Sequence, residues 1–509
     1  MNPLPLIILK HENPVDYNVK PALVLKAGTW DDYGYKTSFS LTYRKENGDE
    51  ISIGDVKIGS VDYKPNGDTY IDEIMDSFYP DGRLPEKFFS LGQDLVYYQQ
   101  VKAYFPECYQ QILENLRDCV VLPTLAENIE QEDVFKTSLL RSEYQKEKQS
   151  AQEAFDYGMD ILNYGKKILD QSFEYIYNPK GTDAPLRIHF DFNGSDLFPR
   201  RLYALIGDNG VGKTTLLNDI PVRLYEQKNS ISEYFHPFPL FKKIITISLN
   251  QYDTFEYPER SESFNYVYCG LVDRKTKSYD KENLANRTID SLSFIYKRDR
   301  EDFLWYVLSG LVDENLIEIL KSLLRNYKRI DVDENKIRGE VRSILNKLSS
   351  GQNSILSVFA NVFAEIRFNS LLLMDEPETH LHPHAISKLM KMLLRILDHY
   401  KSFCILETHS PLIIREHTSD CVYVMESIGT DRCIRFIGTE SLGANLTTLT
   451  NEVFGINDEK SYYVEKIKAL KEEGKSEEEI ISLITSKTGH SVSLNLRLFI
   501  ASIFFENEE

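Results

Sequence analysis

One short segment, GDNGVGKT at positions 207–214, limits what this chain can fold into more than any other part of its sequence. An apolar run at 202–206 precedes it and a helix-like run at 215–220 follows it. The pattern Gly-x-x-x-x-Gly-Lys-Thr between a strand and a helix is typical of a phosphate loop. Its glycines let successive backbone N–H groups point at one anion, and the helix that follows adds its positive end. We therefore predict a site for the phosphates of a nucleotide.

Two side chains of this phosphate loop have the chemistry that a nucleoside triphosphate requires. Lys213 can reach the β- and γ-phosphates, and the Thr214 hydroxyl can bind a magnesium ion that bridges them. The alternative is a chance match in a glycine-rich turn, which explains neither these two residues nor the flanking strand and helix. Mg²⁺ is therefore a predicted cofactor.

Two adjacent carboxylates, Asp375 and Glu376, follow a second apolar run at 370–374. A continuous apolar run is typical of a central parallel strand, and open α/β sheets place their ligands at the carboxyl ends of such strands. We predict that Asp375 holds the magnesium, directly or through water. Glu376 is predicted to polarise the water that attacks the γ-phosphate. A surface turn is the structural alternative for this pair.

Two further apolar runs also end in polar residues. The run at 403–406 leads into ETHSP, in which His409 is placed to hydrogen-bond a γ-phosphate or the attacking water. The run at 244–249 leads into Asn250 and Gln251. Gln251 is the predicted contact to the magnesium shell and Asn250 the second choice, and an ordinary loop amide is the alternative for both.

The segment LSSGQ at 348–352, which we call the signature segment, comes directly before a helical stretch at 353–368. Serine and glycine are common helix caps, so the segment alone says little. However, serine hydroxyls, a glycine N–H and a helix N-terminus together form an anion site. Its place between the phosphate loop and the carboxylate pair makes this second interpretation the stronger one.

We expect three regions along the chain. Residues 1–180 form an N-terminal region, residues 181–455 the nucleotide-binding domain, and residues 456–509 a helical tail. Within the second region, 290–368 is expected to be a helical subdomain that carries the signature segment. The apolar spacing of Leu304, Leu308 and Leu311, and then of Leu316, Leu320 and Leu324, fits a helix pair there.

The N-terminal region is expected to hold a β-meander at 20–75 and helices from 84 to 177. Asn47-Gly48 and Asn66-Gly67 lie between alternating apolar runs, and Asn-Gly accepts the positive φ of tight hairpins. Pro85-Glu86 is the predicted helix start. We predict a partner-binding or regulatory role for this region.

The charge of the chain bears on its partners. The formal net charge is −19, whereas a protein that binds nucleic acid over its whole surface is expected to be basic. Binding of DNA or RNA in a local basic groove stays open. No run approaches the ~20 apolar residues that span a bilayer, so we expect a cytoplasmic protein without a membrane partner.

Four motifs, in this order, resemble those of the ABC-type ATPase heads: the phosphate loop, the signature segment, the Asp375–Glu376 pair and His409. The resemblance covers roughly 186–455. Within that superfamily, DEPETHLHP followed by ETHSP looks like the AAA-family branch that holds the SMC-like DNA-repair ATPases and the overcoming-lysogenization nucleases. The same branch holds the ATPase subunits of Septu, retron-associated and PARIS-type anti-phage systems, which segments 264–271 and 442–446 also resemble. The signature segment departs from LSGGQ by one residue.

This resemblance implies an α/β fold with a mixed sheet flanked by helices, a helical signature subdomain and an added N-terminal region. It implies ATP as the nucleotide, Glu376 as the catalytic base and His409 as the switch histidine. It also implies that the signature segment acts in trans, on the ATP of a second copy. The residues implied at the nucleotide are Asn209, Gly210, Val211, Gly212, Lys213, Thr214 and Thr215, with Ser349, Ser350, Gly351 and Gln352 from the partner.

Three functions follow from these expectations. The first is an ATPase that dimerises through its nucleotide sites and controls a separate effector, such as a nuclease or toxin in anti-phage defence. The second is a nucleotide-sensing scaffold with little hydrolysis, or an SMC-like ATPase of DNA repair. The third, an ATPase subunit of a transporter, is disfavoured because such subunits rarely carry an added region of this length at their N-terminus.

Overall fold

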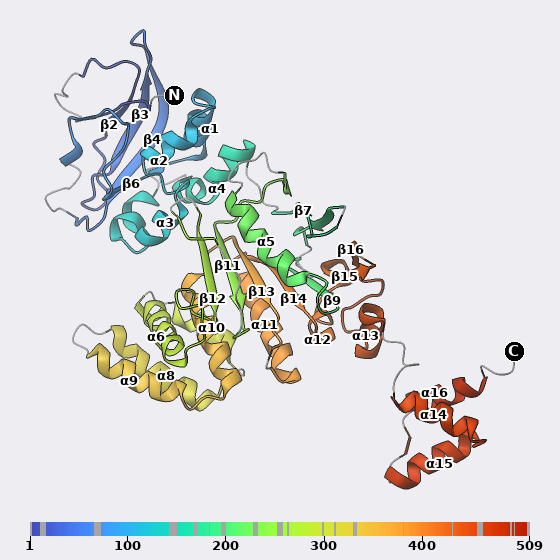
Figure 1. Cartoon of the computed structure of the whole chain (residues 1–509). Helices are drawn as coiled ribbons and strands as arrows, with labels where there is room; N and C mark the ends of the chain where they lie inside the picture. The colour runs from blue at the N-terminus through green and yellow to red at the C-terminus, as the bar shows by residue number, and fades with distance from the viewer. Residues whose placement is uncertain are drawn as a thin grey trace.

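The computed structural model (Figure 1) forms three sheets in the part of the chain that it describes, with six, three and seven strands. The seven-stranded sheet carries the phosphate loop at the end of β9, next to the central strand β14, and the six-stranded sheet lies in the N-terminal region. The described residues are 3–10, 17–65, 73–141, 150–166, 171–182, 184–194, 200–226, 233–251, 258–261, 264–297, 300–309, 312–328, 333–379, 381–429, 431–455, 462–488, 491–492 and 494–505.

The seven-stranded sheet has the order β12-β11-β13-β14-β9-β15-β16. All neighbours in it are parallel except β15 and β16. Strand β14 therefore separates the strand before the phosphate loop, β9, from the strand before the carboxylate pair, β13. Its members are β9 (Leu202–Gly207), β11 (Lys243–Ser248), β12 (Tyr266–Gly270), β13 (Ser370–Asp375), β14 (Phe403–Thr408), β15 (Val422–Ile428) and β16 (Asp431–Phe436).

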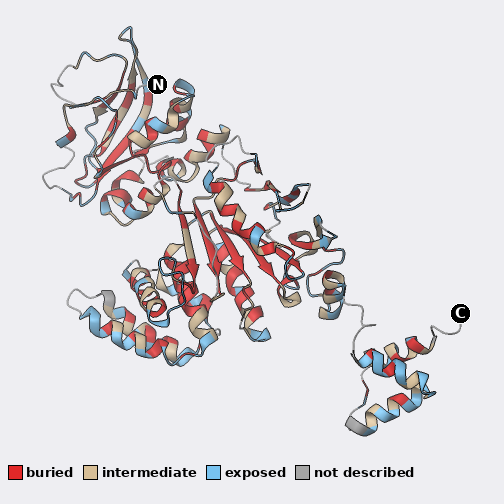
Figure 2. Cartoon of the chain, in the orientation of Figure 1, coloured by how far each residue is buried: buried red, intermediate tan, exposed pale blue. Residues whose placement is uncertain are grey.

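Helices and a small sheet cover the two faces of this sheet, which is why its central strands are buried along their whole length (Figure 2). Leu371 and Leu373 face helix α5 (Lys213–Glu226) and a small sheet of β7 (Phe173–Tyr177), β8 (Leu186–Phe190) and β10 (Phe235–His236). Leu372 and Met374 face the opposite layer, in which α10 and α11 lie. That layer comprises α6 (Lys281–Lys297), α7 (Glu301–Leu308), α8 (Glu314–Leu324), α9 (Glu334–Leu345), α10 (Ser350–Glu365), α11 (Pro383–His399), α12 (Pro411–Ile414) and α13 (Leu446–Phe454).

The predicted helix pair of the signature subdomain is present as α7 and α8. Leu304, Leu308, Leu320 and Leu324 are buried, as their spacing predicts, and Leu316 packs against the same core. Leu311 lies outside the described residues. The predicted helix after the signature segment is α10, which ends at Glu365.

The N-terminal sheet has the order β5-β1-β2-β3-β4-β6. Strands β2, β3 and β4 form the predicted meander, and Asn47-Gly48 makes the β3–β4 turn with Gly48 at φ 95°. Asn66-Gly67 lies outside the described residues. The strands are β1 (Leu6–Leu9), which is parallel to β2, then β2 (Ala22–Ala27), β3 (Ser38–Arg44), β4 (Glu50–Ser60), β5 (Ser77–Tyr79) and β6 (Phe88–Gly92).

The prediction of helices from 84 to 177 was wrong at both ends. Residues 88–92 form β6, because an apolar run beside β4 completes the buried sheet, and the first helix starts only after Asp94. Residues 173–177 form β7, whose alternating burial matches their alternating sequence. Between them lie α1 (Leu95–Tyr104), α2 (Tyr109–Asn115), α3 (Pro123–Ile129), a π-helical turn (Phe135–Leu139) and α4 (Ser150–Tyr164).

The tail is helical, as predicted, with α14 (Tyr462–Glu472), α15 (Glu477–Thr488) and α16 (Leu494–Phe505). Ile467, Ile480 and Ile500 form a small apolar cluster between them. Across the part of the chain that is described, no helix has both the length and the apolar character that a bilayer crossing demands.

Candidate nucleotide site

The phosphate loop has the backbone that its glycines predict. Gly210 and Gly212 adopt φ of 78° and 100°, which is left-handed and costs other residues strain. A Cβ atom at Gly207 would lie 2.1 Å from the carbonyl oxygen of Met425 on β15, so only glycine fits there. Helix α5 begins at Lys213 and directs its N-terminus at the loop.

Lys213 is buried and points back over the loop. Its ammonium group donates hydrogen bonds to the carbonyl oxygens of Gly207 (3.1 Å) and Asp208 (2.9 Å). It also lies 3.1 Å from Nε2 of His409. Burial lowers the pKa of Lys213 from its ordinary value, and the carboxylates of Glu407 and Glu376 offset part of that effect. The side chain therefore sits among the groups of all three strands, β9, β13 and β14.

Thr214 and Asp375 meet at a third acid, Glu407, which the sequence analysis did not single out. The Thr214 hydroxyl donates to Oε1 of Glu407 at 2.5 Å, and Asp375 lies directly opposite Glu407 in the pairing of β13 with β14. Glu407 is fully buried at the end of β14, and burial raises the pKa of its carboxyl. Two buried carboxyl groups in contact repel each other unless a proton or a cation lies between them.

This donor set fits magnesium. A threonine hydroxyl and two carboxylates are hard oxygen ligands, and Mg²⁺ in nucleotide sites takes one or two carboxylates together with phosphate oxygens. Thr214, Asp375 and Glu407 are the residues that would hold it.

Glu376 and His409 face each other across the site. Nε2 of His409 lies 3.4 Å from Oε1 of Glu376, and this hydrogen bond is the largest cause that lowers the pKa of Glu376. Glu376 has a φ of 40°, a conformation that residues other than glycine adopt at a cost. That strained turn directs the carboxylate away from the end of β13 and toward His409.

Glu378 holds the loop that carries His409, and it too was missed from the sequence. Its Oε1 accepts hydrogen bonds from the Thr408 hydroxyl and from the His409 backbone N–H, both at 2.7 Å. The group is mostly buried, which raises the pKa of its carboxyl. Because β13 and β14 are neighbours, the acids in DEPE and ETHSP end at one edge of the sheet. That adjacency, once the strand order is known, is the signal for both Glu378 and Glu407.

The signature segment forms a second group, at the start of α10. Ser349 caps the helix: its hydroxyl accepts from the Gln352 N–H, and the Gln352 side chain accepts from the Ser349 N–H, both at 3.3 Å. Ser349 and Ser350 are exposed, and Gly351 and Gln352 are half-buried. A second molecule can therefore reach these polar groups.

The other predicted residues are placed as follows. Asn209 and Thr215 are exposed at the phosphate loop, whereas the Val211 side chain is buried in the core and only its backbone is left for a ligand. Gln251 follows β11 by three residues, and Ser248 at the end of β11 lies opposite Asp375. Gln251 is thus at the same edge of the sheet, and its contact with the metal stays a prediction.

Comparison with known proteins gives a family for the chain. Residues 267–415 match the model of an AAA-domain family that is described in connection with the AbiEii toxin of type IV toxin–antitoxin systems. The protein ea59 of Escherichia phage lambda is 31% identical over 465 residues, which cover 84% of this chain and 85% of ea59.

Two solved structures are similar at a lower level. The SMC head domain of Thermotoga maritima aligns over 53% of this chain and 100% of its own, at 14% identity and a TM-score of 0.25. An ATP-binding cassette of an ABC transporter in its ADP conformation aligns over 56% of this chain and 94% of its own, at 14% identity and a TM-score of 0.28. The strand order, the phosphate loop and the carboxylate edge define the fold. The chain belongs to the family of the lambda protein ea59, and its central domain is an ABC-type P-loop ATPase domain.

Proposed function

We propose that this protein hydrolyses ATP, dimerises through the nucleotide sites of its two copies and thereby controls a separate effector, a nuclease or a toxin, in defence against phages. The observation that carries the ATPase part is the meeting of Lys213, Thr214, Asp375 and Glu407 at one edge of the sheet. Asp375 and Glu407 end the neighbouring strands β13 and β14, and Lys213 and Thr214 begin the helix after β9. Together these side chains suit the phosphates and magnesium of ATP.

The residues of the site suit an in-line attack of water on the γ-phosphate. Lys213 binds the β- and γ-phosphates, and Glu376 orients and polarises the attacking water. His409, held by Glu378 and in contact with Glu376, hydrogen-bonds the γ-phosphate or that water. Mg²⁺, when bound, neutralises charge that develops on the phosphate oxygens. The exposed Ser350 hydroxyl would complete the pocket of a second copy from outside.

The effector part rests on two likenesses. The matched AAA-domain family is described in connection with a toxin, and the sequence around DEPETHLHP resembles the ATPases of anti-phage systems. ATP-driven closure of a dimer would give such a system a switch between two states of the bound effector.

The test separates binding, dimerisation and turnover. Lys213→Ala should abolish ATP binding, and Ser350→Arg should leave ATP binding intact but block ATP-dependent dimerisation, because Ser350 is exposed on the surface. Equilibrium binding of a fluorescent ATP analogue and light-scattering mass with and without Mg·ATP measure these two effects. Undiminished dimerisation of Ser350→Arg would refute the trans arrangement.

The scaffold alternative is decided by the same preparations. Phosphate release is measured from the protein alone and from the protein purified with its native partner. Nucleotide binding without phosphate release in either sample would contradict the proposed ATPase activity and support a nucleotide-sensing scaffold. Co-purification of a nuclease or toxin supports the effector proposal, and co-purification of DNA-repair proteins instead would contradict it.

A further inference from the structure

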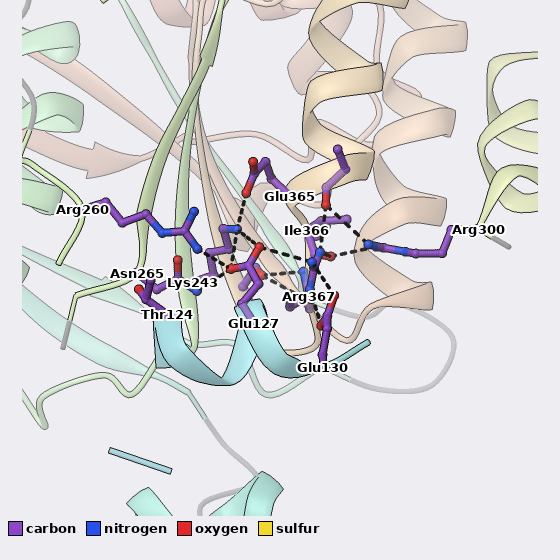
Figure 3. A network of polar contacts seen from close by, with 12 residues as sticks. Thr124, Glu127, Glu130, Lys243, Arg260, Asn265, Arg300, Glu365, Ile366 and Arg367 are labelled. Atoms are coloured by element: carbon purple, nitrogen blue, oxygen red, sulfur yellow. Dashed lines mark hydrogen bonds and ion pairs between the residues drawn. The ribbon is translucent and has the colours of Figure 1, made fainter. Parts of the chain in front are cut away.

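Helix α3 of the N-terminal region meets the seven-stranded sheet at its amino edge, opposite to the nucleotide edge (Figure 3). The elements that begin or end there are β11, which starts at Lys243, and the link from α10 to β13, which contains Arg367. The same link follows the helix that starts with the signature segment. The amino edge is therefore connected to the signature segment through α10.

Glu127 of α3 is the centre of the network at this edge. Its two oxygens lie 2.7 and 2.8 Å from the ammonium group of Lys243, whose side chain is fully buried. The same carboxylate accepts hydrogen bonds from Asn265 (3.0 Å) and Arg260 (2.9 Å) and lies 3.2 Å from Arg367. Burial alone would raise the pKa of Glu127, but Lys243 and Arg367 outweigh it and lower that pKa below the ordinary value.

Glu130, one residue beyond α3, holds Arg367 by both of its oxygens. Nε and one terminal nitrogen of Arg367 donate to Glu130 at 2.9 and 2.7 Å, the paired geometry that guanidinium and carboxylate favour. The other terminal nitrogen of Arg367 donates to the backbone oxygens of Ala364 and Ile366, both at 2.9 Å. One side chain thus ties α3 to the last turn of α10.

A second tie reaches α10 through Lys243. The Lys243 ammonium group is in contact with Glu365, the last residue of α10, as well as with Glu127. The 16 residues of α10 make a rod about 24 Å long, with the signature segment at its far end. Because a regular helix bends little, the position of its last turn sets the position of its first.

We propose that Glu127 and Glu130 are positioning residues of the ATPase: through Lys243 and Arg367 they fix the rear end of α10 against β11 and β13. The N-terminal region thereby sets how the signature segment is presented to the nucleotide of the partner. This inference rests on the proposed dimeric ATPase. It gives the N-terminal region a direct route to the rate of hydrolysis without any contact with ATP.

The test compares Glu127→Gln with a matched control, Asp156→Asn. Asp156 of α4 pairs with Lys242 at 2.8 Å, so it also ties the N-terminal region to the base of β11, but its ion pair is with Lys242 and not with Lys243 or Arg367. Glu127→Gln should lower both kcat and the association constant of the ATP-dependent dimer about tenfold, which is an ordinary size for such a coupling. The affinity of the variant protein for ATP should be unchanged. Asp156→Asn should change none of the three by more than about twofold.

A second measurement reads α10 directly and needs no turnover. Hydrogen exchange of the backbone at 349–356, without nucleotide, should be faster in Glu127→Gln than in the wild type and unchanged in Asp156→Asn. If Glu127→Gln does not fold, Glu130→Gln replaces it, because that side chain is about a quarter exposed and its loss leaves Lys243 paired. Glu130→Asp, which keeps the charge, should recover part of the kcat.

The outcomes are distinct. A wild type without turnover would refute the proposed function, and exchange at 349–356 would still decide the role of α3. Wild-type exchange and wild-type kcat in a folded Glu127→Gln or Glu130→Gln would overturn the positioning role. A loss of ATP affinity in step with kcat would do the same, because it would indicate general damage to the domain.

Discussion

At the carboxyl edge of the seven-stranded sheet, two buried acids face each other, whereas at the amino edge one largely buried acid faces three cations. Glu407 and Asp375 are in contact beneath Thr214, and burial raises the pKa of Glu407. Glu127 lies among Lys243, Arg260 and Arg367, and its pKa is lowered. The two edges belong to the same strands, some 20 Å or less apart at about 3.3 Å per residue.

The difference distinguishes a ligand-binding site from a structural contact between two regions of the protein. An acid whose charge is not compensated by the protein destabilises the fold and favours whatever cation comes to it. An acid that the protein has already neutralised leaves nothing for a ligand and instead holds its neighbours in place. The carboxyl edge is therefore where we propose that Mg·ATP binds, and the amino edge is where the N-terminal region contacts the ATPase domain.

The largest effect is expected at the carboxyl edge. Glu376→Gln should lower kcat by about 10²–10⁴-fold, the usual contribution of a general base, and leave ATP binding intact. The reason is that the amide can hold the water but cannot polarise it. Steady-state phosphate release and binding of an ATP analogue measure the two quantities. Normal turnover in this variant would remove Glu376 from the mechanism, and the carboxyl edge would then lack its proposed catalytic base.

The next effect tests the amino edge. Lys243→Met should lower the free energy of unfolding by about 2–3 kcal/mol, because it leaves the largely buried Glu127 and the partly exposed Glu365 without their common cation. Urea titrations followed by tryptophan fluorescence give the change. Lys401→Met, which removes a surface cation paired with Asp398, is the control and should cost less than about 1 kcal/mol. Equal losses of stability in the two variants would mean that charge does not stabilise the contact at the amino edge.

Much of the carboxyl edge could be predicted from the sequence because its chemistry is carried by short contiguous motifs. The phosphate loop, the Asp375–Glu376 pair and the helix at the signature segment are all present where the sequence placed them. Glu407 and Glu378 were missed, since Glu378 gains its partners only when β13 lies beside β14, and Glu407 gains Thr214 only when β14 lies beside β9. Their roles depend on strand order, which no single motif encodes.

The amino edge could not be predicted at all, for a physical reason. Glu127 and Lys243 are 116 positions apart, and Glu130 and Arg367 are 237 apart. Nothing in the local pattern of a charged residue says which distant charge it will meet. The same limit explains the strand at 88–92, which the local helical pattern hid and which its pairing with β4 determines.

A smaller, pH-dependent effect sharpens the contrast. The pKa of Glu127 is lower in the folded chain than its ordinary 4.5, so its stabilising contribution is present above that value and is lost as the pH falls through the folded pKa. Glu127→Gln should therefore cost about 2 kcal/mol at pH 7, and the cost should shrink below pH 4.5. Urea titrations of both proteins across this range give the difference. A cost that is constant with pH would show that charge is not what Glu127 contributes.

The smallest effect has the opposite sign and belongs to the carboxyl edge. Glu407→Gln should raise the free energy of unfolding of the nucleotide-free protein by about 1 kcal/mol, because an amide can accept from Thr214 without adding a second charge beside Asp375. The same variant should gain less thermal stability from Mg·ATP than the wild type does, since one oxygen ligand has lost its charge. Thermal melts with and without Mg·ATP test both halves. If the variant is less stable than the wild type and gains as much thermal stability from Mg·ATP, Glu407 stabilises the fold, as Glu127 does, and does not bind the metal.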